Sequence, residues 1–301
     1  MPRGRRLKVI GDEAYYHIIS RTVGQEFYLN EVEKEKLLSI IKRYTRLYFI
    51  EVIGFCIMSN HFHLLIKSEP GDNYSDEDIL SRLCAFYEKE PFHFKGKIEE
   101  YRRKLSDISE YMKCIKQRFT LWYNKMNNRS GYFWGDRFKS VLVEDGDALI
   151  NTLCYIDLNP IRANIVDRPE DYRWSSIGYF VQSNNRDNFL YTQEMFEVDE
   201  REFLSFYRGI VYRAGGIKKS GYGEIDEKVM EFEEKRGFKL AKGEVFNNRV
   251  RYFTEGAVLG SKSFILKAYA KFGGLVIKKK ERKAHKTELG ENIFSLRCLR
   301  N

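Results

Sequence analysis

The sequence predicts an α+β fold, a ferredoxin-like sandwich in which helices cover an antiparallel sheet. The chain has 301 residues, of which 43% are hydrophobic and 15% aromatic, so it can bury a sizeable core. Its apolar pattern alternates between period two and period 3.6 in the order strand, helix, two strands, helix, strand, which is typical of that fold. We expect the core and its next helix to occupy residues 1–180, followed by a mainly helical accessory region at 181–301.

The first half of the core contains three predicted strands and one helix. Residues 15–20 are β-branched and aromatic, which favours a strand. Asn30 and Glu33 form a capping-box pattern, and apolar residues then recur at helical spacing through residue 48. Residues 52–58 and 61–67 are apolar runs separated by a two-residue turn, so they predict two antiparallel strands of a hairpin.

The second half continues the same pattern after a polar segment. We interpret residues 69–105 as an insertion with short helical stretches, because a Pro-Gly break opens it. A helix is predicted at 108–123, a fourth strand at 138–144 and a further helix at 147–158, which Pro160 ends. The polar run at 182–186 is a predicted linker.

Charge and cysteine content narrow the class of protein. The net charge is +9 with a pI near 9.1, and basic residues gather at 3–8 and 278–286, which suits a polyanionic partner. The five cysteines are far apart and contain no Cys-x-x-Cys spacing, so neither a disulfide framework nor a thiolate zinc site is indicated. No apolar run is long enough for a membrane span and no signal peptide is evident, so we expect a cytoplasmic protein without a membrane partner.

The most informative motif is a pair of histidines in the third predicted strand. Side chains in a strand alternate between two faces, so His61 and His63 share one face and both imidazoles can reach one divalent ion. Such a pair alone is more often structural than metal-binding. His17 is expected to be a core or rim histidine, and His93 and His285 lie in polar stretches, so we leave these three out of the site.

A tyrosine and an asparagine complete the predicted constellation. Tyr155 lies in the helix predicted at 147–158, and Asn159 follows four residues later, so at helical spacing the two side chains point the same way. Asn159 can supply a third ligand beside the histidines, and imidazole with an amide oxygen suits Mg²⁺ or Mn²⁺. Tyr155 is then the predicted nucleophile, with Tyr111 and Tyr123 as less favoured candidates.

Five segments together resemble a known family. They occur in the same order over about residues 10–180 and resemble the HUH single-tyrosine transposases, in particular the REP-associated branch. The segments are residues 58–65, 121–124, 131–140, 155–163 and 172–176.

The resemblance implies a specific activity on an HUH endonuclease core. By position, His61 and His63 match the paired metal ligands, Tyr155 the nucleophile and Asn159 the third ligand. Such enzymes cut single-stranded DNA near repeat-associated hairpins, keep a 5′-phosphotyrosine link, release a 3′ hydroxyl and rejoin DNA by the reverse attack. Residues that could bind the DNA, chosen by type, are Arg137, Lys139, Trp122 and Trp134.

Two other classes of function stay open. A metal-dependent phosphodiester hydrolase without a covalent step would keep its activity after Tyr155→Phe. A catalytically inactive repeat-DNA-binding protein would bind hairpins without cleaving them. Whether the chain works as a monomer or a homodimer is also open.

Overall fold

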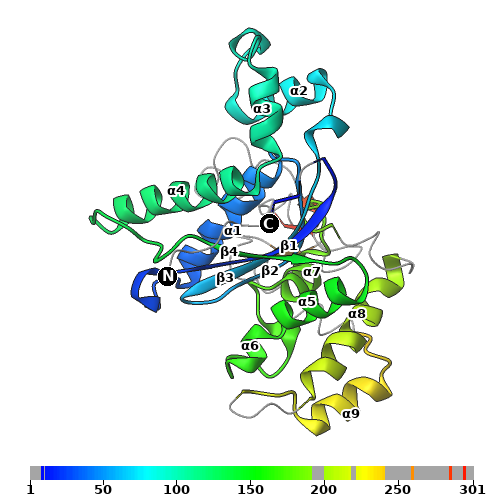
Figure 1. Ribbon diagram of the computed structural model, residues 1–301. Coiled ribbons are helices and arrows are strands. Elements are labelled where there is room, and N and C mark those ends of the chain that lie inside the picture. The colour runs from blue at the N-terminus through cyan, green and yellow to red at the C-terminus, as the bar shows by residue number, and fades with distance from the viewer. Residues whose placement is uncertain are drawn as a thin grey trace. The chain divides into compact units, whose positions relative to one another are not determined.

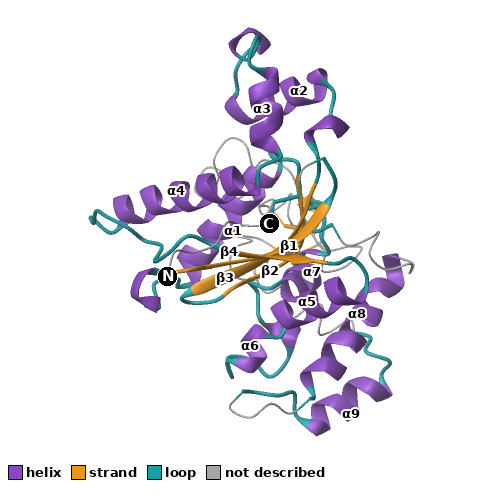
Figure 2. Cartoon of the chain, viewed as in Figure 1, coloured by secondary structure: helices purple, strands orange, loops and turns teal. Residues whose placement is uncertain are grey.

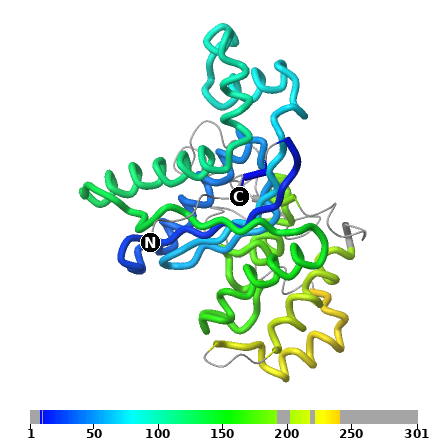
Figure 3. The backbone as a smooth tube through the Cα atoms, in the orientation of Figure 1, coloured from blue at the N-terminus to red at the C-terminus, as the bar shows by residue number. Residues whose placement is uncertain are grey.

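The core is a four-stranded antiparallel sheet with strand order β2-β3-β1-β4. The computed structural model describes residues 8–9, 11–191, 200–217 and 222–240, and three residue pairs at 259–260, 285–286 and 294–295. The strands are β1 (Ala14–Arg21), β2 (Ile50–Ile57), β3 (His61–Ser68) and β4 (Lys139–Val143). Figure 3 shows β1 running between β3 and β4, two segments that lie far apart in the sequence. The predicted ferredoxin-like α+β fold is therefore confirmed.

Helices cover both faces of this sheet. The helices α1 (Glu31–Thr45) and α4 (Ile108–Met126) pack against each other on one face, and α5 (Asp147–Asp157) packs on the other, mainly over β2 (Figure 1). The side chain of Phe62 points to the α4 side, where its ring contacts Trp134. The neighbouring residue His63 points to the α5 side, where its ring contacts Tyr155.

The boundaries of α1 differ slightly from the prediction. Asn30 occupies the N-cap position, but its side chain makes no cap hydrogen bond. The helix ends at Thr45, and the next residues form a turn in which the amides of Leu47 and Tyr48 donate to the carbonyl of Tyr44. Apolar residues in this turn keep the helical spacing, which explains why the sequence predicted a helix that continues to residue 48.

The predicted insertion at 69–105 contains short helices. These are η2 (Gly71–Asn73), α2 (Asp76–Tyr87), η3 (Pro91–His93) and α3 (Ile98–Leu105). In Figure 2, α2 and α3 form a pair that projects away from the sheet. The hydroxyl of Ser75 accepts from the amide of Asp78, whose carboxylate accepts from the amide of Ser75, so a full capping box starts α2.

After α5 the chain returns to the sheet and covers its edge. The elements are α6 (Asn159–Arg162), η4 (Pro169–Asp171) and α7 (Ser176–Ser183), and Pro160 lies in the first turn of α6. The segment 172–176 runs beside β2: the amide of Ile57 donates to the carbonyl of Trp174 over 2.8 Å, and the hydroxyl of Tyr172 donates to the carbonyl of Ile57 over 2.8 Å. An open edge of a sheet invites pairing with other chains, and this segment blocks it.

The chain divides into two compact units, Met1–Tyr179 with Asn188–Phe238 and Phe180–Asp187 with Lys239–Asn301. The first contains the sheet together with α8 (Glu200–Gly215) and α9 (Glu227–Lys235); a boundary at residue 180 stays a prediction. In the second, three short strands pair in the order β5-β7-β6; the expectation of a mainly helical region at 181–301 stays a prediction. These strands are β5 (Leu259–Gly260), β6 (His285–Lys286) and β7 (Phe294–Ser295).

Among the described residues, no helix combines the length and apolar character needed to span a bilayer.

Candidate active site

The two histidines of β3 lie side by side on the face of the sheet that α5 covers. Their ring centroids are 5.0 Å apart and the rings are inclined by 78°. Both side chains are largely enclosed, with His63 only 2% exposed. The alternation of the strand therefore brings His61 and His63 together as predicted.

Each of these imidazoles uses its Nδ1 in a hydrogen bond. Asn60 Nδ2 donates to the carbonyl of Gln25 over 3.0 Å, so Asn60 Oδ1 faces His61 and accepts from His61 Nδ1 over 2.6 Å. His63 Nδ1 lies 2.8 Å from Nε2 of His17. The Nε2 atom of His63 is buried and has no hydrogen-bond partner in the part of the chain that is described.

This pattern fits a divalent cation. A histidine that ligates a metal commonly donates its other ring N–H to a carbonyl, carboxylate or similar acceptor, which fixes its tautomer. Here both Nδ1 atoms are held, and Nε2 of His63 has no hydrogen-bond partner among the described residues. An ion would satisfy the buried Nε2 of His63, which otherwise loses a hydrogen bond that water could have made.

His17, which the sequence analysis left out, belongs to this cluster. The pairing register places Ile19 opposite His63 and His17 opposite Leu65, so all four side chains lie on the α5 face. The rings of His17 and His63 are nearly parallel, at 17°, with centroids 5.1 Å apart. To place His17 on the same face as His63, one must know how β1 and β3 pair. The sequence alone does not give this register.

The environment keeps the histidines neutral. Burial lowers the pKa of His17 to about 4. Burial, with a smaller effect of the nearby Arg21 cation, lowers the pKa of His61 to about 4. Burial is the main cause that lowers the pKa of His63 to about 2, and the neighbouring His61, His17 and Arg21 contribute smaller effects in the same direction. At neutral pH the imidazoles therefore retain the lone pairs that metal coordination needs.

Tyr155 lies next to the histidines and is also open to solvent. Its ring meets His63 edge-on at 5.8 Å and His17 at 5.9 Å between centroids. The side chain is 51% exposed, so a large substrate can reach the hydroxyl. The opposite face of α5 is buried through Leu149, Leu153 and Ile156, as the helical spacing predicted. The structure thus brings together three predicted site residues, His61, His63 and Tyr155.

Asn159 lies one helical turn beyond Tyr155, at the start of α6. Its Nδ2 donates to the carbonyl of Tyr155 over 2.9 Å and to that of Ile156 over 3.2 Å. The nitrogen is therefore engaged, and Oδ1 is the atom that can ligate an ion. Within the described residues, no group of three His, Cys, Asp or Glu side chains could hold a metal, so a complete site needs this amide oxygen or oxygens from solvent and substrate.

A buried carboxylate fixes the end of the tyrosine helix. Asp157 is fully buried; its carboxylate accepts from the amide of Ile177 over 3.1 Å and from the hydroxyl of Tyr207 over 2.5 Å. Burial raises the pKa of Asp157 to about 6. These bonds join α5 to α7 and α8, so they determine where Tyr155 lies. Sequence reasoning did not identify Asp157, because its partners are 20 and 50 residues away.

A glycine allows α5 to approach the sheet closely. A Cβ atom on Gly54 of β2 would lie 2.1 Å from Cδ1 of Leu153 and 3.0 Å from the hydroxyl oxygen of Ser176. A side chain at this position would force the end of the Leu153 side chain to move.

Cationic side chains surround the face that carries the histidines. Arg21 pairs with His61 across the two strands, and its side chain is exposed. Lys139 pairs with Ile19, which in turn pairs with His63, so Lys139 points to the same face from the edge strand β4. Lys139 and Arg137 are both exposed.

The tryptophans and alternative tyrosines are less accessible. Trp134 is 7% exposed, its indole N–H donates to the carbonyl of Lys116, and its ring packs in the core. Trp122 is half-buried. Tyr111 and Tyr123 are buried on α4, on the opposite side of the sheet from the histidines. Of these three tyrosines, Tyr155 is the one that is exposed and lies beside the histidines.

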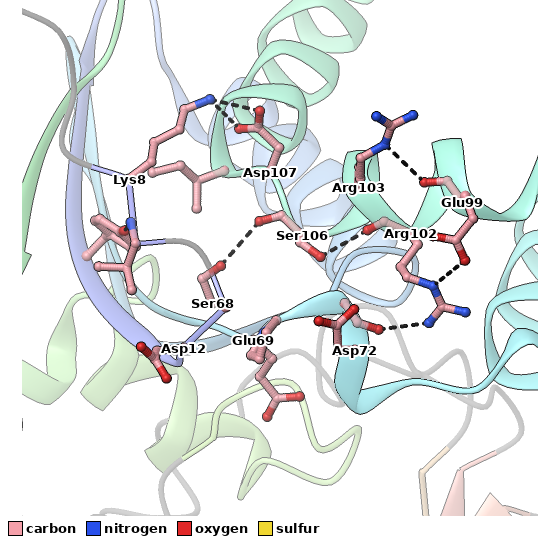
Figure 4. A pocket seen from close by; sticks show the side chains of 16 residues that line it. Lys8, Asp12, Ser68, Glu69, Asp72, Glu99, Arg102, Arg103, Ser106 and Asp107 are labelled. Carbon is pink, nitrogen blue, oxygen red and sulfur yellow. Dashed lines mark hydrogen bonds and ion pairs between the residues drawn. The ribbon is translucent and has the colours of Figure 1, made fainter.

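A separate pocket of about 500 Å³ lies at the other end of the sheet (Figure 4). It is bounded by the ends of β1 and β3 that lie away from His61, and by α3 and the start of α4. Lys8 forms an ion pair with Asp107 at 2.8 Å, and the hydroxyl of Ser68 donates to the carbonyl of Ser106. None of the predicted site residues lines it.

Comparisons with known proteins agree with the motifs. Residues 12–77 match the family model described as IS200-like transposase. A Haemophilus influenzae protein, named as a candidate REP-associated tyrosine transposase, is 27% identical over 150 residues, which cover 50% of this chain and 68% of the relative. The resemblance that the sequence indicated is therefore confirmed.

Two solved structures are also similar to parts of the chain. A REP-associated tyrosine transposase bound to a REP hairpin aligns with a TM-score of 0.43 and 16% identity, covering 75% of this chain and all of that one. A candidate transposase from Deinococcus radiodurans aligns with a TM-score of 0.27 and 16% identity, covering 48% of this chain and 87% of that one.

Proposed function

We propose that this protein is a metal-dependent transposase and endonuclease that nicks and rejoins single-stranded DNA through a 5′-phosphotyrosine intermediate. The observation that carries the proposal is the contact between Tyr155 and His63. An accessible phenol lies against an imidazole whose Nε2 is buried and has no hydrogen-bond partner in the described part of the chain. The match to the IS200-like transposase model over the strands that carry His61 and His63 supports the same assignment.

The proposed metal site consists of His61 and His63 through their Nε2 atoms and Asn159 through Oδ1. Bound Mg²⁺ or Mn²⁺ would act as a Lewis acid on a phosphate oxygen. Asn60 holds His61 in the tautomer that leaves Nε2 free. The low pKa values of both histidines prevent protons from competing for these atoms near neutral pH.

Tyr155 performs the covalent step. Its hydroxyl oxygen attacks the phosphorus, the bond from phosphorus to the 3′ oxygen breaks, and a phosphotyrosine bond forms. The phenolic proton passes to solvent, and the departing 3′ oxygen takes up a proton. One phosphodiester replaces another, so attack by a 3′ hydroxyl on the phosphotyrosine rejoins DNA without an external energy source.

The cations on the same face bind the DNA backbone in this proposal. Arg21 and Lys139 flank the histidines from β1 and β4, and phosphate is the anion that such a surface attracts. A phenol has a reference pKa of about 10 and is a weak nucleophile, so fixed positive charge near the phosphate stabilises the charge that develops. We include Arg137 among the backbone contacts and leave out the buried Trp134.

The proposed substrate is a single strand that contains a repeat-associated hairpin. Support comes from the resemblance to the REP-associated branch and from the net charge of +9, which favours a polyanionic partner.

The test uses labelled single-stranded hairpins from the host genome, incubated with the full-length protein and Mn²⁺. We expect a protein–DNA adduct that survives denaturing electrophoresis. Tyr155→Phe should abolish the adduct while hairpin binding persists, and the matched control Tyr132→Phe, at a tyrosine that is 85% exposed, should leave it unchanged.

Other outcomes would favour the alternative functions. Cleavage that survives Tyr155→Phe would indicate a phosphodiester hydrolase without a covalent step. Hairpin binding without cleavage by the wild-type protein would indicate an inactive repeat-DNA-binding protein.

A further inference from the structure

We propose that His17 is a positioning residue that holds His63 in the tautomer needed for metal coordination. This inference rests on the proposed metal site and extends it to a third histidine. His17 lies in the middle of β1, is 7% exposed, and points to the face of the sheet that carries His61 and His63.

One short hydrogen bond joins the rings of His17 and His63. His17 Nε2 and His63 Nδ1 are 2.8 Å apart. One of these nitrogens must carry a hydrogen and the other must offer a lone pair, because two neutral imidazoles can form the bond in only these two ways. The two arrangements have opposite consequences for the far side of His63.

In the first arrangement His63 donates. Its hydrogen sits on Nδ1, so Nε2 has a lone pair that an ion can use. In the second, His17 donates, and His63 then carries its hydrogen on Nε2. That N–H would be buried without an acceptor among the described residues, and it could not ligate an ion. Metal binding therefore selects the arrangement in which His17 accepts.

The partner of His61 shows the same design with a different residue. Asn60 Oδ1 accepts from His61 Nδ1, just as His17 Nε2 would accept from His63 Nδ1. Each proposed histidine ligand thus has one dedicated acceptor for its Nδ1 hydrogen. Orienting partners of this kind affect metal affinity although they do not touch the ion.

His17 also lies against the nucleophile. Its ring meets Tyr155 edge-on at 5.9 Å and stacks on His63 at 5.1 Å. Nε2 of His17 is used by His63, so His17 cannot ligate the same ion through this atom while it accepts that bond. Its role is therefore to orient a ligand.

The test compares two substitutions at this position in the full-length protein. His17→Phe keeps a flat ring for packing but removes the acceptor, whereas His17→Gln keeps an amide oxygen that can accept from His63. We measure the Mn²⁺ dissociation constant by electron paramagnetic resonance, and thermal unfolding in chelator to check the fold. We expect His17→Phe to weaken Mn²⁺ binding by roughly 10- to 100-fold, and His17→Gln to retain most of the wild-type affinity.

A second measurement needs no variant at position 17. Long-range ¹H–¹⁵N spectra of the wild-type protein with Mg²⁺ should show His63 with its hydrogen on Nδ1, the resonances being assigned with His63→Ala. A hydrogen on Nε2 of His63 would overturn the proposal. Equal loss of affinity in both variants would also overturn it, because it would indicate packing or direct ligation by His17.

The results separate this inference from the proposed function. If wild-type protein binds Mn²⁺ through His61 and His63 while His17→Phe binds equally well, only the positioning role fails. If wild-type protein binds no Mn²⁺, the metal site fails and the positioning role fails with it.

Discussion

Metal binding should be almost independent of pH between 8 and 5.5, which is unusual for a site built on histidines. A proton and a metal ion compete for the same lone pair, so the pKa of the metal-free histidine decides when affinity declines. At the ordinary pKa of 6.5, each imidazole is only about 9% neutral at pH 5.5, and two such ligands would lose about a hundredfold in affinity.

The structure predicts a different curve. Burial lowers the pKa of His61 to about 4 and that of His63 to about 2, so both remain neutral at pH 5.5. The affinity should then change by less than about twofold and decline only as the pH approaches 4. His17, with a pKa lowered to about 4, also stays neutral and can still accept its hydrogen bond.

The assay is Mn²⁺ titration followed by electron paramagnetic resonance, in buffers that do not chelate the ion. His61→Ala provides the control for binding elsewhere on the protein. A thirtyfold or greater loss between pH 8 and 5.5, with a midpoint near 6.5, would refute the reasoning from burial.

Three further predictions concern the helix that carries the tyrosine, the buried ion pairs and the DNA contacts. Gly54→Ala should lower the free energy of unfolding by about 1–3 kcal/mol, because the new Cβ overlaps Leu153, and the double variant with Leu153→Ala should lose less than the sum of the two single losses; an unchanged urea midpoint for Gly54→Ala would contradict this. Arg208→Met should cost about 3–5 kcal/mol in the same assay, since it removes the buried cation that Glu170 and Glu233 share, although Glu233 keeps its ion pairs with Arg168 and Arg236; a loss below about 1 kcal/mol would contradict this. The logarithm of hairpin affinity should fall less steeply with the logarithm of salt concentration in Lys139→Gln, with a slope smaller in magnitude by about one. An unchanged slope would exclude a phosphate contact by Lys139.

Local patterns predicted the sheet and the residues on its faces. Alternation placed His61 and His63 on one face, and helical spacing separated the buried Leu149, Leu153 and Ile156 from Tyr155. Side chains on one face recur every two residues along a strand and about every 3.6 residues along a helix. Both periods can therefore be read from the sequence alone.

Features that depend on long-range pairing were not predictable in the same way. His17 joins the site only because Ile19 pairs with His63, and a shift of one residue would put it on the other face. Nothing in the local sequence marks Asp157, whose buried carboxylate accepts hydrogen bonds from Tyr207 and Ile177 at the end of α5. Trp134 was chosen as a DNA contact by residue type, and its burial against Phe62 and Phe119 became clear only from the packing.

The most direct test of the account is to identify the residue that becomes attached to DNA. The full-length protein is incubated with a cleavable hairpin substrate and Mn²⁺, the adduct is digested, and the nucleotide-bearing peptide is sequenced by mass spectrometry. The account predicts a 5′-phosphate ester on Tyr155, lost when His61 and His63 are both replaced by alanine. An ester on any other residue, or cleavage products formed without a covalent adduct, would contradict it.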